Sequence, residues 1–399
     1  MAKRKLNKIK TFFMSLICLI VGLAVGFFAN IYITLPESYK IPEAVQGSTH
    51  FHTTGELNVE TIKSEDLSIH FIELGNKYTG DCTFVKVGNT EMLIDAGSRA
   101  TSIPFIQQYI EEYCTDDVLE YVVVTHAHQD HYAGFATGAN TNSLFDLNTI
   151  ETVIDFGEAT NKTSGTMFNN YKRELAEEVE AGAKHFSALE CVNETNGATR
   201  SFNLKDDGSI KFEILYHKYY EHTINKAESE NDYSVCLQIV HGEKKFLFTG
   251  DLEAEGEESL IEENKAGGKN EGMLSKVALY KAGHHGSKTS SSDALLEVIQ
   301  PDIVCVCCCA GSSEYTSKNE NQFPTQAFIN RVSKYTSAIY VTTLCTDYSS
   351  NKFESMNGNI VVCSSGTNNI SVSCSNNTTK LKDTEWFKQN RTLPDGAAA

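Results

Sequence analysis

Basic residues are scarce in this chain once its first ten positions are passed. Those positions hold five of the 34 Lys and Arg residues and no acidic residue, so the remainder carries 29 basic against 52 acidic side chains, a net charge of −23. A body with this charge is soluble and repels polyanions at long range, which argues against a broad DNA-binding surface. It does not exclude phosphate chemistry at a metal centre, where the ion supplies the positive charge.

The cysteines lack the pattern of a disulfide framework or of a thiolate metal site. Of the twelve, Cys18 lies in an apolar N-terminal run, which leaves an odd eleven. Cys305, Cys307, Cys308 and Cys309 crowd one apolar run without the usual paired spacing. We therefore expect them to pack as small hydrophobic side chains in a core strand. Proline is scarce as well, and Gly and Asn mark many of the turns.

Charge is absent from residues 11–35, and this predicts a transmembrane signal anchor. At about 1.5 Å per residue, 25 helical residues reach roughly 37 Å, enough for a ~30 Å hydrocarbon core. The basic residues 1–10 should stay in the cytoplasm, which places the chain after Leu35 outside the cell membrane. A cleaved signal peptide is the alternative and would give a secreted protein, although its apolar region would usually be shorter.

The rest of the chain predicts a linker, one large α/β domain and a tail. Residues 36–66 show little periodicity, residues 67–375 alternate strand and helix patterns, and residues 376–399 are polar and expected to be loosely held. Two hairpins, within 82–94 and 234–249, share one layout and are each followed by helix. Two such halves predict two sheets packed face to face with helices outside, a four-layer αββα sandwich.

A histidine-rich motif directly follows an apolar run that reads as a buried strand. The motif is His126-Ala127-His128-Gln129-Asp130-His131, after residues 121–125. A tight turn after a strand can point three imidazoles and a carboxylate into one cavity, and neutral imidazole is the commonest protein ligand for divalent ions. A lone histidine is usually a satisfied polar residue, but this pattern in this context indicates a site for one or two metal ions.

Three further features can complete the site. Asp251 emerges where the strand around residues 246–249 ends, after Gly250. His284 and His285 follow another strand, with glycine on both sides. The third feature is a run at the start of a helix, whose free amides and hydroxyls could bind an anion or simply cap the helix. Its candidate substrate-binding residues are Ser287, Lys288, Thr289 and Ser290.

Together these motifs resemble the metallo-β-lactamase superfamily, and within it the hydrolase domain of the ComEC/Rec2 competence proteins. The resemblance covers about residues 68–375, without the multi-helix channel of full ComEC proteins. It rests on the stretches 93–97, 125–131 with Gly134, 231–235, 248–253 and 284–290.

The resemblance implies a centre of two divalent ions, with zinc the first expectation and manganese the alternative. The ligands would be His126 and His128 for the first ion, Asp130, His131 and one of His284 and His285 for the second, and Asp251 as the bridge. We favour His285 because a Gly-Ser pair follows it directly.

The implied activity is phosphodiesterase- or nuclease-like hydrolysis by a metal-bound hydroxide, since a bound water has a pKa near 7. Asp130 would orient the water as the catalytic residue, and Asp95 is a candidate to support a ligand from behind. The substrate would be a phosphodiester, a nucleic acid or a small cell-surface molecule, and no protein partner is implied. The alternatives are a surface esterase, a β-lactamase-like amide hydrolase, and a degenerate protein that binds without turnover.

Two departures from the family pattern affect this interpretation. Many relatives have one more ligand histidine just before the second hairpin, where this chain has Glu230-Asn231-Asp232. Asn231, or His217 or His222 nearby, would have to replace it, or the first ion is held weakly. Relatives also often carry a histidine before a proline where this chain has Phe323, so the activity could differ.

Overall fold

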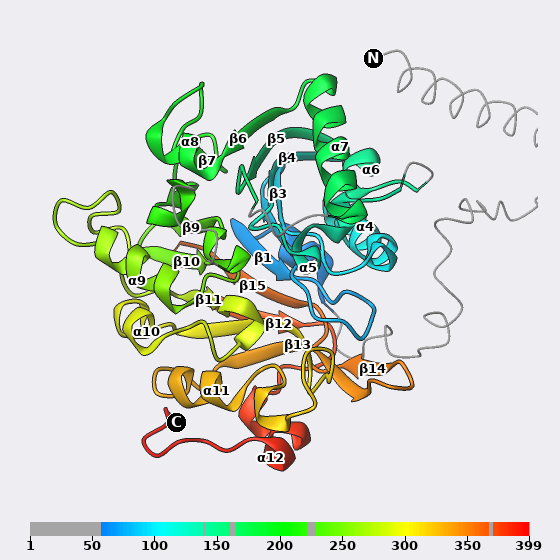
Figure 1. Ribbon diagram of the computed structural model, residues 1–399, viewed down its shortest axis with the longest axis vertical. Coiled ribbons are helices and arrows are strands. Elements are labelled where there is room, and N and C mark those ends of the chain that lie inside the picture. The colour runs from blue at the N-terminus through cyan, green and yellow to red at the C-terminus, as the bar shows by residue number, and fades with distance from the viewer. Residues whose placement is uncertain (1–56, 139–140, 160–164, 222–228, 367–369, 399) are drawn as a thin grey trace, which may run out of the picture. The chain divides into compact units, whose positions relative to one another are not determined.

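A computed structural model of the protein describes residues 57–138, 141–159, 165–221, 229–366 and 370–398 (Figure 1). The anchor predicted at 11–35, most of the linker and His222 lie outside the described residues. Among the residues that are described, none of the helices has the length and apolar character needed to cross a membrane.

Two mixed sheets of eight strands each form the framework of the domain. The first has the order β16-β15-β1-β2-β3-β4-β5-β6 and the second the order β14-β13-β12-β11-β10-β9-β8-β7. The strands of the first sheet are β1 (Leu67–Phe71), β2 (Thr83–Val87), β3 (Thr90–Ile94), β4 (Val118–Val123), β5 (Thr149–Asp155), β6 (Lys184–Ser187), β15 (Ile360–Ser364) and β16 (Ile370–Cys374). Those of the second are β7 (Ser201–Asn203), β8 (Ile210–Leu215), β9 (Cys236–His241), β10 (Lys244–Phe248), β11 (Leu279–Lys281), β12 (Ile303–Ala310), β13 (Ile339–Asp347) and β14 (Lys352–Ser355).

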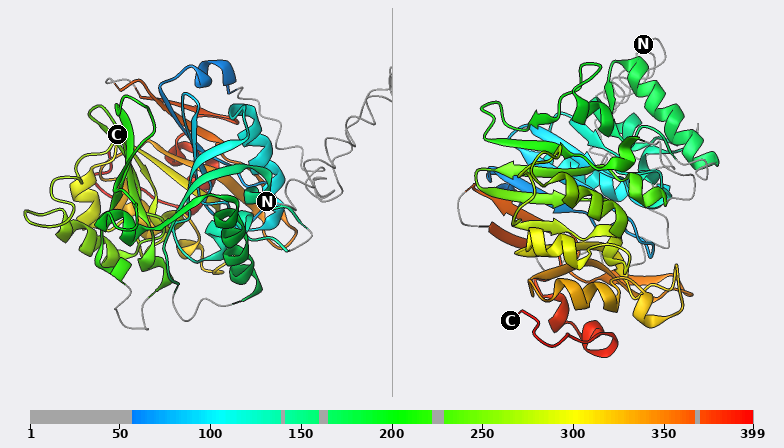
Figure 2. Two further views of the ribbon diagram at one scale, coloured as in Figure 1. Left: turned by 90° about the horizontal axis from the view of Figure 1, so that it is seen from above. Right: turned by 60° about the vertical axis from the view of Figure 1, so that its left-hand side comes forward.

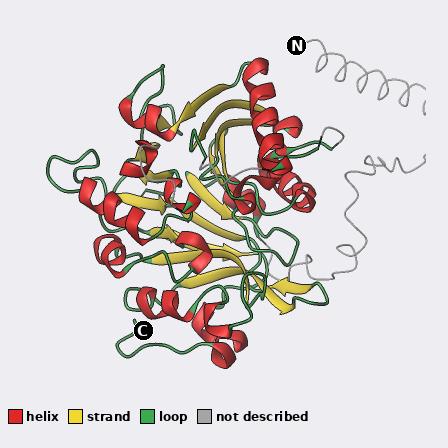
Figure 3. Ribbon diagram, viewed as in Figure 1, coloured by secondary structure: helices red, strands yellow, loops and turns green. Residues whose placement is uncertain are grey.

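Helices lie on the outside of the two sheets (Figures 2 and 3). They include α3 (Val59–Lys63), α4 (Ile103–Tyr113), α5 (Gln129–Tyr132), α6 (Leu144–Leu147), α7 (Thr166–Ala181), α8 (Ala188–Asn193), α9 (Ala254–Glu263), α10 (Asp293–Ile299), α11 (Gln326–Val332) and α12 (Glu385–Asn390). Between the sheets, Phe71 of β1 stacks on Phe248 of β10 with ring centroids 6.4 Å apart. The expectation of two face-to-face sheets with helices outside is confirmed for the described residues.

The cysteine-rich run forms the fully buried strand β12. Its cysteines are free, like every other cysteine among the described residues. Burial raises the pKa of these thiols, so they stay protonated and behave as small apolar side chains. The prediction of structural rather than ligating cysteines therefore agrees with their placement.

Both ends of the domain differ from the expectation. The folded body begins before Leu67, because α3 packs Ile62 into the core. The prediction of a loose tail after residue 376 is wrong, since Leu381 and Phe387 are buried against the second sheet. The Arg391 guanidinium also donates hydrogen bonds to backbone carbonyls. A few residues of this polar segment therefore attach it to the domain.

Candidate metal centre

The candidate site forms where parallel strands of both sheets end side by side. In the first sheet, Ile94 at the end of β3 pairs with Val123 at the end of β4, so Asp95 and the histidine motif emerge at the same edge. In the second sheet, β10 and β11 are also parallel, which brings Asp251 next to the His284–His285 turn. Four segments that are distant in sequence thus deliver their polar side chains to one place.

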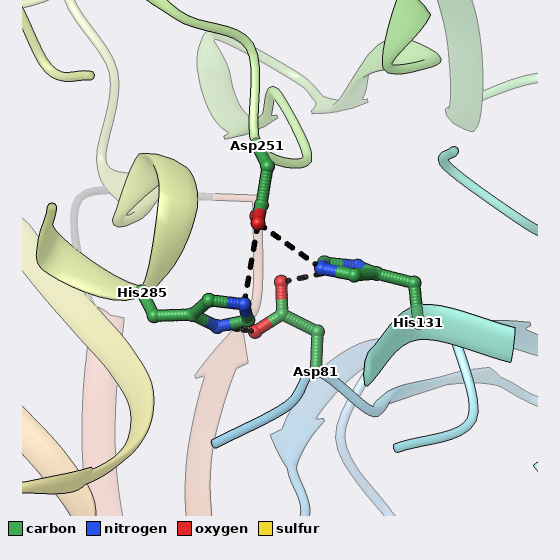
Figure 4. A group of neighbouring side chains, drawn as sticks. All are labelled: Asp81, His131, Asp251 and His285. Carbon is green, nitrogen blue, oxygen red and sulfur yellow. Dashed lines mark ion pairs between the residues drawn. The ribbon is translucent and has the colours of Figure 1, made fainter. Parts of the chain in front are cut away.

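The Oδ2 atom of Asp251 is the point on which the imidazoles converge. The Nε2 atom of His131 lies 3.2 Å from it and that of His285 lies 3.3 Å away (Figure 4). The Nε2 atoms of His284 and His126 follow at 3.8 Å and 4.0 Å. One carboxylate oxygen therefore faces the same nitrogen of four histidines.

Asp130 and His128 complete the set of predicted ligands. The Oδ2 atom of Asp130 lies 3.4 Å from His285 Nε2, and the Nδ1 atom of His128 lies 3.0 Å from His126 Nε2. All six residues predicted as ligands are therefore brought together around Asp251. Their roles as ligands remain predictions.

The donor set fits divalent ions. His131 Nε2, His285 Nε2 and Asp251 Oδ1 are fully buried and form no hydrogen bond within the described part of the chain. Buried polar atoms without such a partner are costly, and an ion ligated at this cluster would satisfy them. Imidazole nitrogens with carboxylate oxygens are donors that suit zinc and comparable divalent metals.

Asp81 is a residue of the centre that sequence reasoning missed. It forms a group with His131, Asp251 and His285 whose ligand atoms all lie within 4.8 Å of one another. However, its carboxylate faces the Nδ1 atoms, at 3.0 Å from His285 and 3.8 Å from His131, whereas Asp251 faces the Nε2 atoms (Figure 4). Asp81 thus lies behind the two rings, and the hydrogen bond at His285 Nδ1 goes to the Cys307 carbonyl, at 3.0 Å.

The Asp81 loop reaches the site because Gly80 allows a close approach. A Cβ atom at Gly80 would lie 2.8 Å from the Asp130 carbonyl oxygen, to which the Asp81 amide donates a hydrogen bond of 3.1 Å. A single aspartate in a loop between two strands carries no periodic signal. Only the Gly-Asp pair before a strand hints at such a role.

Lys281 is a second missed residue, expected only as the end of a core strand. Its side chain is buried, forms an ion pair with Asp81 and lies 3.7 Å from Asp251 Oδ1. Burial lowers the pKa of this lysine, but the two carboxylates outweigh that effect and raise it. The centre therefore contains a permanent cation that partly neutralises its carboxylates.

The carboxylates and imidazoles of the centre shift one another's pKa values. Burial alone lowers the pKa of His131, but Asp251 and Asp95 reverse this and raise it to about 10. Burial raises the pKa of Asp251, whereas the surrounding histidines lower it well below its usual value. The carboxylate is accordingly ionised at neutral pH and ready to accept a cation.

The run predicted to bind an anion is already engaged with the protein. Glu257 accepts hydrogen bonds from the amides of Ser291 and Ser292, where α10 begins. The hydroxyls of Ser287 and Thr289 bond to each other, and Thr289 Oγ1 lies 3.0 Å from His284 Nδ1. A carboxylate of the chain thus occupies the helix start. Ser290 is buried and Lys288 is exposed, and their substrate role remains a prediction.

The two departures from the family pattern have different outcomes. Asn231 lies at the centre, with its Nδ2 atom 3.5 Å from His284 Nδ1, whereas His217 Nε2 bonds to the Ser234 carbonyl. Phe323 packs against His284 and His285 with ring centroids 5.8 Å and 5.9 Å apart. An aromatic wall therefore stands where relatives often carry a histidine.

Comparisons with known proteins agree with this geometry. Residues 75–142 and 227–310 match the model of the metallo-beta-lactamase superfamily. The chain is 39% identical over 107 residues to competence protein ComA of Neisseria gonorrhoeae, covering 27% of this chain and 14% of that protein. It is 29% identical over 113 residues to recombination protein 2 of Haemophilus influenzae, covering 28% of this chain and 12% of that protein.

The solved structures found to be similar include the metallo-beta-lactamase fold protein YhfI of Bacillus subtilis, with 11% identity and a TM-score of 0.35 over 69% of this chain and 95% of that one. The two segments that match the family model contain every histidine and carboxylate of the centre. These two segments are similar in sequence to the metallo-β-lactamase superfamily.

Proposed function

We propose that the domain is a metal-dependent hydrolase that cleaves phosphodiesters with two divalent ions, zinc first and manganese as the alternative. The observation that carries this proposal is the convergence of four imidazole Nε2 atoms on Asp251 Oδ2. When bound, such ions polarise the scissile bond and lower the pKa of water.

The residues of the chain would prepare the site in three ways. Asp251, ionised and buried, would hold the ions together, while Asp95 fixes the ring of His131 and Asp81 lies behind that of His285. Asp130 accepts a hydrogen bond of 3.1 Å from the Tyr315 hydroxyl, on the open side of the centre, and would orient the attacking water. Burial of the histidines would exclude other water and strengthen each electrostatic contact.

A phosphodiester substrate is supported by the relatives, whose names refer to competence and recombination. The matched segment spans only 14% and 12% of those proteins, so their full activities do not transfer. The acidic body disfavours long-range attraction of a polyanion, so capture of nucleic acid would depend on the centre itself.

We further propose that residues 11–35 anchor the protein in the membrane, with the domain outside the cytoplasm, or that they are cleaved to release it. A fusion of a periplasm-active reporter after residue 66 should be active, and one after residue 10 inactive. If the fusion after residue 66 is active only with a reporter that works in the cytoplasm, this location is overturned.

The function is tested by metal content and turnover of the purified domain. We expect at least one equivalent of bound zinc or manganese, and cleavage of bis-p-nitrophenyl phosphate that Asp130→Ala abolishes. The matched control is His185→Asn, a histidine bonded to Asp155 outside the centre, which should keep both properties. Less than one equivalent, together with no cleavage above the Asp130→Ala variant, overturns the proposal. Cleavage of a β-lactam or carboxylic ester instead would favour the alternative substrates.

A further inference from the structure

We infer that His284 supplies the third imidazole of the first ion site, beside His126 and His128. This inference rests on the proposed two-ion centre and assigns a ligand that the chain lacks at residues 230–232. Under it, His284 and His285 are both ligands, one for each ion. One turn of the chain would then supply a histidine ligand to each of the two ions.

The backbone of the His284–His285 turn is the first support. Both residues are left-handed, with φ 46° and ψ 51° at His284 and φ 54° and ψ 25° at His285. This region is sparsely populated for residues other than glycine, and a strained backbone at such a place indicates a functional constraint. In an extended chain neighbouring side chains point to opposite faces. Here the turn directs both Nε2 atoms to Asp251 Oδ2, at 3.8 Å and 3.3 Å.

The contacts of the other ring nitrogen are the second support. His284 Nδ1 lies 3.0 Å from Thr289 Oγ1 and 3.5 Å from Glu253 Oε1. A ligating histidine usually donates its other N–H to a carboxylate or another acceptor, which fixes the tautomer and leaves the free nitrogen for the metal. His131 has the same arrangement, with Asp95 at Nδ1 and Asp251 at Nε2.

Asn231 supports this arrangement and does not compete with it. Its Nδ2 atom lies 3.1 Å from Glu253 Oε1, the same oxygen that faces His284 Nδ1. The Asn231 amide therefore fixes the Glu253 carboxylate, which in turn contacts His284.

The balance of donors is the third support. His284 and His126 share a neighbour, because the Nε2 atoms of both lie within 4.0 Å of Asp251 Oδ2, and His126 Nε2 in turn lies 3.0 Å from His128 Nδ1. Each ion would then have three protein ligands besides the shared Asp251. An incompletely filled coordination shell leaves room for water or substrate, as catalytic sites require. Without His284, the first site would have only two imidazoles.

The test counts ions in the full-length protein by cobalt titration, which is read from the absorption spectrum and by calorimetry. Wild type should bind two equivalents. His284→Asn should lose tight binding of one equivalent, by at least about 100-fold in affinity, and keep the other. Asparagine tolerates the left-handed backbone, so this variant should fold, which circular dichroism without metal checks. Glu253→Gln should weaken the same ion by about 10-fold.

Two matched variants distinguish the outcomes. His285→Asn should lose the other equivalent, whose cobalt spectrum differs, and His185→Asn should lose neither. If His284→Asn keeps both equivalents at unchanged affinity, the inference is overturned while the two-ion hydrolase stands. If wild type binds two ions, loses one in His284→Asn and cleaves no phosphodiester, the inference holds and the proposed activity fails.

Discussion

The Nδ1 atom of His131 lies 2.7 Å from the Oδ2 atom of Asp95, and the opposite nitrogen of the ring faces Asp251. Asp95 also accepts hydrogen bonds from the amide and the hydroxyl of Thr125, at 2.8 Å and 2.9 Å. It therefore fastens the end of β3 to the start of the histidine motif. By holding the proton at Nδ1, it leaves Nε2 available to a metal.

Replacing this carboxylate should weaken metal binding without abolishing the fold. We expect Asp95→Asn to lower the affinity for the ion bound by His131 by about 10- to 100-fold, because the ring loses its charged partner. Competition with a chromophoric chelator measures the change. Asp155→Asn is the matched control, since Asp155 is also buried and bonded to a histidine, His185, away from the centre. An equal loss in both variants would show that the effect is general destabilisation.

The buried ion pair of Lys281 and Asp81 should be strongly coupled. Lys281→Met leaves the Asp81 carboxylate buried without its cation, which should destabilise the metal-free protein by about 3–5 kcal/mol. Adding Asp81→Asn should recover part of that loss. Urea unfolding with a chelator present gives the four free energies of the cycle. Additive effects of the two substitutions would contradict the pairing.

The hydroxyl of Tyr315 should matter for turnover more than for stability. Desolvation at the hydroxyl and then the charge of Asp130 raise the pKa of this phenol, so it stays protonated and donates to the carboxylate. We expect Tyr315→Phe to lower kcat for bis-p-nitrophenyl phosphate by about 2- to 10-fold, the value of one hydrogen bond. The free energy of unfolding should change by less than about 0.5 kcal/mol, because the ring is exposed. The control is Tyr335→Phe, after the end of α11, which should leave kcat and the free energy of unfolding unchanged. A wild-type kcat in Tyr315→Phe would show that the hydroxyl has no role in turnover.

Glu73 should make stability depend on pH. Burial raises the pKa of Glu73 to about 7, against hydrogen bonds donated by Ser355 and Thr343 that lower it. A carboxyl group with a raised pKa in the folded state favours folding when protonated, so stability falls as pH rises from about 4.5 to 7 and then levels off. Relative to Glu73→Gln, wild type should lose about 3 kcal/mol over this interval. Thermal or urea unfolding of both proteins across pH 4.5–8 checks this, and a pH-independent difference would refute it.

Local signals carried most of what the sequence could predict. The motif from His126 to His131, Asp251 and His285 each follow a strand, which the hydrophobic pattern predicts. That they share one site was implied by the family resemblance. Asp81 and Lys281 could not be found this way, because their roles come from a tertiary ion pair. Glu257 likewise caps α10 from another helix, and no spacing in the sequence indicates that contact. Short strands such as β7 and β14 lack enough residues for a periodic pattern.

The C-terminal segment reaches the centre through Arg391. Its guanidinium donates to the carbonyls of Pro324 and Gln322, on both sides of the phenylalanine that packs against His284 and His285. The segment after α12 therefore supports the backbone on both sides of Phe323, beside the candidate metal centre. Removal of Arg391 would take away these two hydrogen bonds and so loosen the packing of Phe323 against His284 and His285.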